Sequence, residues 1–256
     1  MTWVYTSESE LENFVWNVFN AVFKVSEMTD EDNQSSLVKF MEKLRKTEVT
    51  VTDQDGQSLE LTVEGGKLWT DMPTFGWVAR DLWNLDPRAT LEVDEYKRVF
   101  RHTLFLAQLT ARSKNIHDVM DPFNFSMFGL WALRAAFEED PMRHTGSSRH
   151  ITDIKLAAVW IRCAGRVLLK LSEHNVELPG NVAAGGSMHA NRGFKGFSMK
   201  RWDIWKHGFI SAKRVNLLPS DKDLLELVLI DLERLKPSVS NGYKSSDRPQ
   251  QGYDKV

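Results

Sequence analysis

The sequence contains very little cysteine and no long apolar run. Cys163 is the single cysteine among 256 residues, so no internal disulfide can form and a reducing compartment is the natural expectation. No stretch approaches the roughly 20 apolar residues that a membrane-spanning helix requires. The segment MTWVYTSESELENF carries acids where a secretion signal would carry positive charge. We therefore expect a soluble protein of the cytosol or nucleus, neither secreted nor inserted in a membrane.

The common motifs of catalysis and cofactor binding are also missing from the sequence. It has no HExxH motif, no paired CxxC and no GxSxG elbow. The glycine-rich stretch GNVAAGGSMHANRGFKG matches neither a P-loop nor a dinucleotide fingerprint, and it does not follow a strand as both motifs require. Cys163 lies in an apolar stretch, where a thiol is usually an inert small hydrophobe. These absences predict no cofactor and no nucleophilic cysteine.

Metal binding has only weak support. His144, His150 and Asp153 fall in one polar stretch, and His150 and Asp153 are one helical turn apart. No second carboxylate or histidine set accompanies them at a spacing typical of metal ligands. We interpret all three as loop and capping residues, and we predict no metal site.

Strong charge of one sign is absent as well. The formal net charge of −2 argues against wholesale nucleic-acid binding. The exception is residues 189–214, where seven lysines and arginines accompany one acidic residue. Such a segment can bind an acidic partner, although a solvated charged face is the commoner explanation.

Most of the chain shows the apolar spacing of amphipathic helices. Residues 48–63, EVTVTDQDGQSLELTV, alternate instead around an Asp55-Gly56 turn, which predicts a β-hairpin that must pack against the helices. We predict an all-α fold: a single-domain orthogonal helical bundle of about eight helices over residues 1–236, with this one small hairpin. The polar residues 237–256 are predicted to be a disordered tail. The helices are expected near residues 9–25, from 29 or 30 to 44, from 71 or 74 to 84, and near 91–113, 122–137, 152–174, 198–212 and 220–235.

Three charged residues lie in or beside otherwise apolar helices. Arg112 ends the apolar run of one helix, while Arg134 and Glu138 are four residues apart on the next and can pair. A buried charge needs a partner or a wet cavity. The three residues therefore form either a structural ion network or the lining of a polar cavity suited to a ligand carboxylate or to acid–base chemistry.

The segment GFKGFSMKRWDIWKHGF mixes aromatic and basic residues. Trp202, Trp205 and Phe209 share one helical face, which favours docking on the core, while the basic residues face solvent or a ligand. Base stacking with phosphate contact is the alternative. Ser198 is expected to cap this helix, and Ser220 the last one. If a ligand binds near this segment, the residues expected to contact it are Trp160, Arg201, Trp202, Trp205 and Lys206.

The glycine-rich residues 180–196 are long for an idle connection in a compact domain. They form either a flexible surface loop or a lid over a pocket.

Several segments together resemble a fungal family of unknown function. They are GGKLWTDMPTFGWVARDLWN, LAQLTAR, FGLWALRAAFEE, LAAVWIRCAGRVL and GFSMKRWDIWKHGF, in this order, over roughly residues 65–235. Members of that family are all-helical proteins of filamentous ascomycetes, so the resemblance implies a helical fold and a fungal origin. It implies no activity, cofactor or catalytic residue.

Three functions remain open from the sequence. The first is a non-catalytic helical module that binds a protein partner or a small ligand. The second is a cofactor-free isomerase, cyclase or dehydratase of fungal specialised metabolism that uses an Arg/Glu-lined cavity. The third, which we consider unlikely, is a nucleic-acid or phosphate binder that uses residues 189–214.

Overall fold

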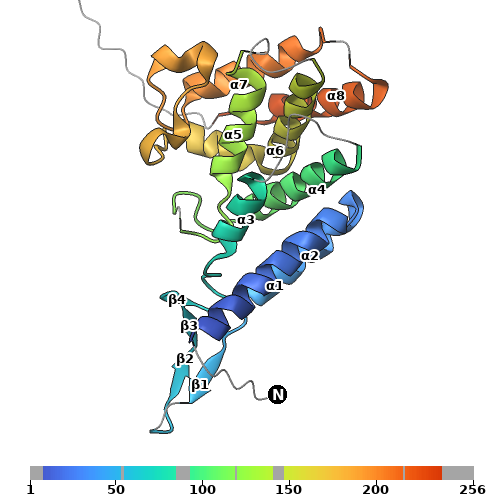
Figure 1. The fold of residues 1–256 in the computed structure, drawn as a ribbon. Coiled ribbons are helices and arrows are strands. Elements are labelled where there is room, and N and C mark those ends of the chain that lie inside the picture. Colours follow the sequence, from blue (N-terminus) through green and yellow to red (C-terminus); the bar gives the residue numbers. More distant parts are fainter. Residues whose placement is uncertain are drawn as a thin grey trace, which may run out of the picture.

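The protein is mostly helical, as the sequence predicts. A computed structural model describes residues 8–52, 55–84, 93–118, 120–140, 147–215 and 217–237. Over these ranges the chain forms eight α-helices that pack together, with short 3-10 helices and two small antiparallel sheets (Figure 1). The described helices include none that is long and apolar enough to cross a membrane. One domain over residues 1–236 stays a prediction, and the tail from residue 238 onward lies outside the described ranges.

The first half of the chain forms one end of the molecule. Helix α1 (Glu8–Met28) is followed by the 3-10 helix η1 (Glu31–Asn33) and by α2 (Gln34–Leu44), and α3 (Phe75–Asn84) comes after the strands. Helix α4 (Val93–Thr110) packs against both α1 and α2. Stacked rings of Phe23 and Phe75, with centroids 4.9 Å apart, join α1 to α3. Aromatic side chains therefore contribute to the core of this end, together with buried aliphatic residues such as Val15 and Met41.

The second half of the chain is organised around α6 (Ser147–Glu173), a helix of 27 residues. It packs against α4, α5 (Ser126–Phe137), α7 (Met199–Ala212) and α8 (Pro219–Arg234). A stripe of apolar side chains with helical spacing is buried along it, which explains why so many helices share it as a neighbour. These are Ile154, Ala157, Ile161, Ala164, Leu168 and Leu171.

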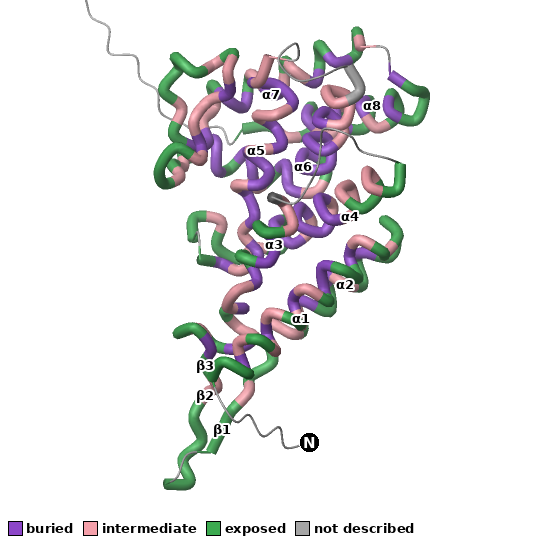
Figure 2. Tube along the Cα trace, viewed as in Figure 1, coloured by how far each residue is buried: buried purple, intermediate pink, exposed green. Residues whose placement is uncertain are grey.

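The predicted hairpin is present, but its surroundings differ from the prediction. Strands β1 (Thr50–Thr52) and β2 (Ser58–Glu60) pair antiparallel, and Val51 lies opposite Leu59. Both side chains are exposed, and the hairpin projects from the end of the molecule beyond α1 (Figure 2). The expectation that β1 and β2 pack on the helices is therefore wrong. A second sheet of β3 (Thr62–Val63) and β4 (Gly66–Lys67), which the sequence analysis missed, carries the contact to α1.

The connection between α4 and α5 is held by one carboxylate. Asp121 is buried, and its oxygens accept hydrogen bonds from the backbone amides of Lys114, Asn115 and Phe123 at 3.0 to 3.2 Å. Arg45, just after α2, adds an ion pair of 2.9 Å to the same carboxylate. Burial opposes ionisation of Asp121, but these hydrogen bonds and the Arg45 charge outweigh it and lower its pKa. The loop is thereby tied to the first half of the chain.

The two predicted caps have different outcomes. Ser198 is the N-cap of α7, and its side chain accepts a hydrogen bond from the Arg201 amide, which confirms the prediction. Ser220 caps nothing, because α8 begins one residue earlier, at Pro219. A proline at the first helical position has the right φ and no N–H that would need a partner.

Candidate functional site

Glu138 and Arg201 are paired at the centre of the second half of the chain. Both side chains are fully buried, and the guanidinium contacts the carboxylate twice, with Nε–Oε1 at 2.6 Å and Nη2–Oε2 at 3.0 Å. Trp205, one turn further along α7, donates its indole N–H to the same Oε1 at 2.7 Å. The prediction that the basic residues of this helix face solvent or a ligand is therefore wrong for Arg201. The helix dipole disfavours the positive charge of Arg201 in the first turn of α7, and the buried Glu138 carboxylate compensates for this.

The same pair fastens the glycine-rich segment to the helices. Arg201 Nη1 donates to the carbonyls of Ala183 and Gly196 at 2.7 and 3.0 Å. Glu138 Oε2 accepts from the Gly186 amide at 3.1 Å. A Cβ on Gly186 would lie 2.5 Å from the Glu138 carbonyl oxygen, so only glycine fits there. Residues 180–196 thus pack against the end of α5 through these bonds.

Arg134 belongs to this arrangement and Arg112 does not. Arg134 Nη1 reaches the carbonyls of Val182 and Ala184, at 3.2 and 3.3 Å, and its ion pair is with Glu139 at 4.0 Å. Arg112 is exposed in the turn that follows α4, so it needs no buried partner. The structure therefore does not bring the three predicted residues together as one ion network or one cavity.

The other predicted ligand contacts are mostly core residues. Trp160, Trp202 and Trp205 are at most 3 % exposed, which confirms that the tryptophans of α7 dock on the core. Trp160 packs so closely on α5 that a Cβ on Gly129 would come within 2.8 Å of its ring. Lys206 is half-buried on α7.

Two further predictions concern metal ligands and the cysteine. Within the described ranges no three His, Cys, Asp or Glu side chains gather as metal ligands would. Asp153 lies 4.0 Å from Arg149, and His144 is outside the described residues. Burial raises the pKa of Cys163 to about 11, since the nearby Arg162 only partly offsets it. A thiol with that pKa is almost entirely protonated at neutral pH.

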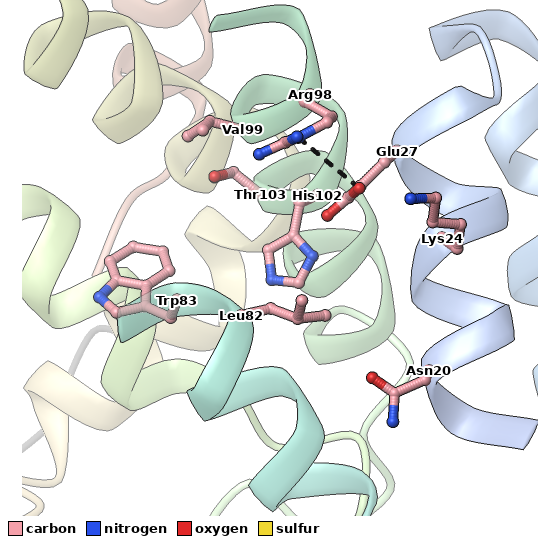
Figure 3. Close-up of a pocket in the computed structure, with 9 residues that line it drawn as sticks. All are labelled: Asn20, Lys24, Glu27, Leu82, Trp83, Arg98, Val99, His102 and Thr103. Atoms are coloured by element: carbon pink, nitrogen blue, oxygen red, sulfur yellow. Dashed lines mark ion pairs between the residues drawn. The ribbon is translucent and has the colours of Figure 1, made fainter. Parts of the chain in front are cut away.

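A pocket that the sequence analysis missed lies between α1, α3 and α4. Its volume is about 330 Å³. Polar and apolar side chains from the three helices converge on it (Figure 3). None of the residues that line it comes from the 180–196 segment. They are Asn20, Lys24 and Glu27 from α1, Leu82 and Trp83 from α3, and Arg98, Val99, His102 and Thr103 from α4.

Glu27 and Arg98 form the charged part of the pocket. Glu27 is 14 % exposed, and its Oε2 lies 3.7 Å from Arg98 Nε. Burial raises the pKa of Glu27, and the positive charges of Arg98 and Lys24 only partly oppose this effect. Titratable groups perturbed by burial, in a concave site, are typical of functional sites.

His102 and Thr103 form the inner wall of the pocket on α4. Both are buried, and the His102 ring packs against Phe23 at a centroid distance of 5.2 Å. Thr103 has no exposed surface, and its hydroxyl has no hydrogen-bond partner within the described part of the chain. In contrast, Thr110 on the same helix bonds back to the Leu106 carbonyl at 2.9 Å.

A sequence signal for this wall did exist. His102 and Thr103 stand where the charged first half of α4 changes to its apolar second half, LFLAQLT. Polar residues at that boundary are candidates to line a cavity. Glu27 gave no such signal, because its burial depends on how α1 meets α4.

Comparison with known proteins supplies a family but no activity. No curated protein matches the chain, and no solved structure matches it. A family model described as "Protein of unknown function (DUF3632)" matches residues 19–209. That range contains every residue that lines the pocket and both members of the Glu138–Arg201 pair. Because the match covers well over half of the sequence, the chain belongs to this family, DUF3632.

Proposed function

We propose that this protein is a non-catalytic module that binds a small organic molecule in the pocket between α1, α3 and α4. A volume of about 330 Å³ lies within the usual range for ligand sites. The lining also has the usual composition of such sites, in which apolar walls accompany a few polar groups that fix orientation.

The Thr103 hydroxyl is the observation that carries the proposal. A buried polar group without a partner costs roughly 1–3 kcal/mol, so folded proteins rarely keep one. Thr103 lines the pocket, is fully buried and has no hydrogen-bond partner among the described residues. The hydroxyl lies behind the pocket surface, so a bound molecule with one hydrogen-bonding group satisfies it when the side chains that cover it move aside. The unpaired hydroxyl destabilises the free protein. Binding of a molecule that pairs with it removes this cost, so the site selects molecules that carry such a group.

The other two functions receive less support from the same contacts. The enzyme alternative placed its cavity at Arg112, Arg134 and Glu138, yet the Glu138 carboxylate is occupied by Arg201, Trp205 and Gly186. A stacking platform for nucleic acid needs exposed rings, yet Trp202 and Trp205 are buried. A protein partner in place of a small ligand, a fungal origin and a role in specialised metabolism stay predictions from the sequence.

Native mass spectrometry of the purified protein, supported by thermal-shift measurements with a metabolite library, tests the proposal. Val99→Phe places a large side chain on the pocket wall. Val25→Phe makes the same change on α1, at an exposed residue that does not line the pocket. We expect a copurifying or stabilising small molecule for the wild type and for Val25→Phe, and none for Val99→Phe. Equal binding by both variants would contradict the proposal, as would turnover of the bound molecule.

A further inference from the structure

The charges around the pocket are distributed unequally. Lys24 and Arg98 are positive and sit at the rim, where Lys24 is exposed and the Arg98 side chain is 55 % exposed. Glu27 is the single acidic residue among those that line the pocket, and it lies deeper. A molecule that approaches the pocket therefore meets two cations first, which favours an anion over a cation.

Glu27 does not occupy the whole guanidinium of Arg98. Their contact is through Nε at 3.7 Å, which is longer than a hydrogen bond. Figure 3 shows the other end of the Arg98 guanidinium directed away from Glu27. The planar guanidinium fork fits a carboxylate with two parallel hydrogen bonds. Arg98 can therefore donate hydrogen bonds to a ligand carboxylate while it stays near Glu27.

The backbone carbonyls at the end of α1 do not compete with a ligand for the Arg98 guanidinium. The last carbonyls of α1 accept hydrogen bonds from side chains: Gln34 Nε2 donates to Ser26 O at 2.9 Å, and Arg101 Nη1 to Glu27 O at 3.4 Å. The side chain of Thr29 adds a bond to Val25 O at 2.6 Å. These donors offset the partial negative charge that a helix C-terminus would otherwise place beside the site.

The rest of the pocket suits a flat apolar body. Leu82 and Val99 supply aliphatic surface, and the Trp83 indole lies at one side (Figure 3). The Trp83 ring is held by an edge contact with Phe128, at a centroid distance of 5.1 Å and an angle of 78°, and by Trp131 at 6.3 Å. Its position is thus fixed by the core, and the ring offers a preorganised wall.

Building on the proposed ligand site, we infer that the molecule it binds is a small organic carboxylate with a flat, apolar body. The carboxylate pairs with Arg98 at the rim, and the body lies against Trp83, Leu82 and Val99. Phosphate-bearing molecules are a different class, and none of the residues that line the pocket belongs to the first turn of a described helix, where backbone N–H groups would bind a phosphate.

A carboxylate in this position also couples binding to a proton. The charged and titratable groups near Glu27 are Lys24 on its own helix and Arg98, Arg101 and His102 on α4, with Arg101 paired to Asp30, while α3 contributes the uncharged Leu82 and Trp83. A second negative charge here raises the Glu27 pKa further, so binding takes up a proton and becomes tighter as the pH falls. Protonated Glu27 can then donate a hydrogen bond to the ligand.

Calorimetric titration with 2-naphthoate and 2-naphthamide tests the inference, because the two probes share a shape and differ in charge. We expect naphthoate to bind the wild type at least tenfold more tightly, a difference of about 1.4 kcal/mol. Arg98→Met should remove this preference. Lys97→Met removes one charge from the same helix at an exposed residue outside the pocket, and should keep it.

The pH dependence provides a second readout. Naphthoate affinity should rise as the pH is lowered below 7, and Glu27→Gln should reduce this dependence and strengthen binding at neutral pH. Equal or tighter binding of naphthamide would overturn the inference and leave the pocket as a site for neutral molecules. Failure of both probes would also overturn it, and the Val99→Phe comparison would then decide separately whether the pocket binds any ligand.

Discussion

Glu138 at the end of α5 and Arg201 in the first turn of α7 form a fully buried ion pair with two hydrogen bonds. The pair is 63 residues apart in sequence, and it also holds the glycine-rich segment through Gly186 and Ala183. It therefore joins the end of α5 to the glycine-rich segment and to the start of α7, which are far from α5 in sequence.

The removal of one member of this pair should destabilise the fold strongly. Arg201→Met leaves the Glu138 carboxylate buried without its countercharge, which costs about 3–5 kcal/mol. The double variant Glu138→Leu/Arg201→Met buries no charge, so its free energy of unfolding should fall less than that of the single variant. Urea unfolding monitored by tryptophan fluorescence measures both. Lys200→Met, at an exposed neighbour, should change the free energy of unfolding by less than about 0.5 kcal/mol. A single variant as stable as this control would show that the pair contributes nothing.

Gly208 sets how closely α7 approaches α5. A Cβ at this position would overlap the ring of Phe137, which itself packs against Phe209 with centroids 4.5 Å apart. Gly208→Ala should therefore lower the free energy of unfolding by about 1–3 kcal/mol. Gly76 in α3 has open space around it, so Gly76→Ala should instead stabilise by about 0.5–1 kcal/mol. Chemical denaturation should show that the free energy of unfolding falls in Gly208→Ala and rises in Gly76→Ala. Changes of the same sign would contradict the close approach of α7 to α5.

Asp121 should govern part of the stability in acid. Its folded pKa lies below the ordinary carboxyl value. Its contribution is therefore complete above the unfolded pKa of about 4 and is lost as the pH falls through the folded pKa. Asp121→Asn should cost about 1–3 kcal/mol at neutral pH and reduce the fall in melting temperature below about pH 4. Asp118→Asn changes an exposed carboxylate in the same loop and serves as the control. If the melting temperatures of Asp121→Asn and the wild type fall in parallel as the pH is lowered, Asp121 does not have this role.

The helices of the fold could be predicted from apolar spacing, because each one buries a stripe of its own side chains. The anchoring of Trp202, Trp205 and Phe209 followed from that spacing and is confirmed. The burial of Arg201 did not follow from that spacing. A charge beside a stripe of aromatic residues looks solvent-exposed until the partner carboxylate on another helix is known.

The pocket was harder to predict for a related reason. Its lining comes from three helices, and no two of its polar residues from different helices are near in sequence. Local pattern can show that α4 changes character at His102, but it cannot show that Glu27 lies across from it. The second sheet, β3 and β4, was missed because its two-residue strands are too short to show alternation.

Glu27 should lower the stability of the folded protein at neutral pH, as a residue kept for binding can do. Its folded pKa is raised by burial, so the folded state favours the protonated carboxyl. The stability that protonation provides is lost as the pH rises through the folded pKa. Glu27→Gln keeps the shape and removes the charge. Its melting temperature should therefore exceed that of the wild type at pH 7, and the difference should shrink as the pH falls toward 4. Glu31→Gln, at an exposed carboxylate in η1, should show no such trend. If Glu27→Gln instead melts below the wild type at pH 7, the contact with Arg98 stabilises the fold, and Glu27 is a structural residue.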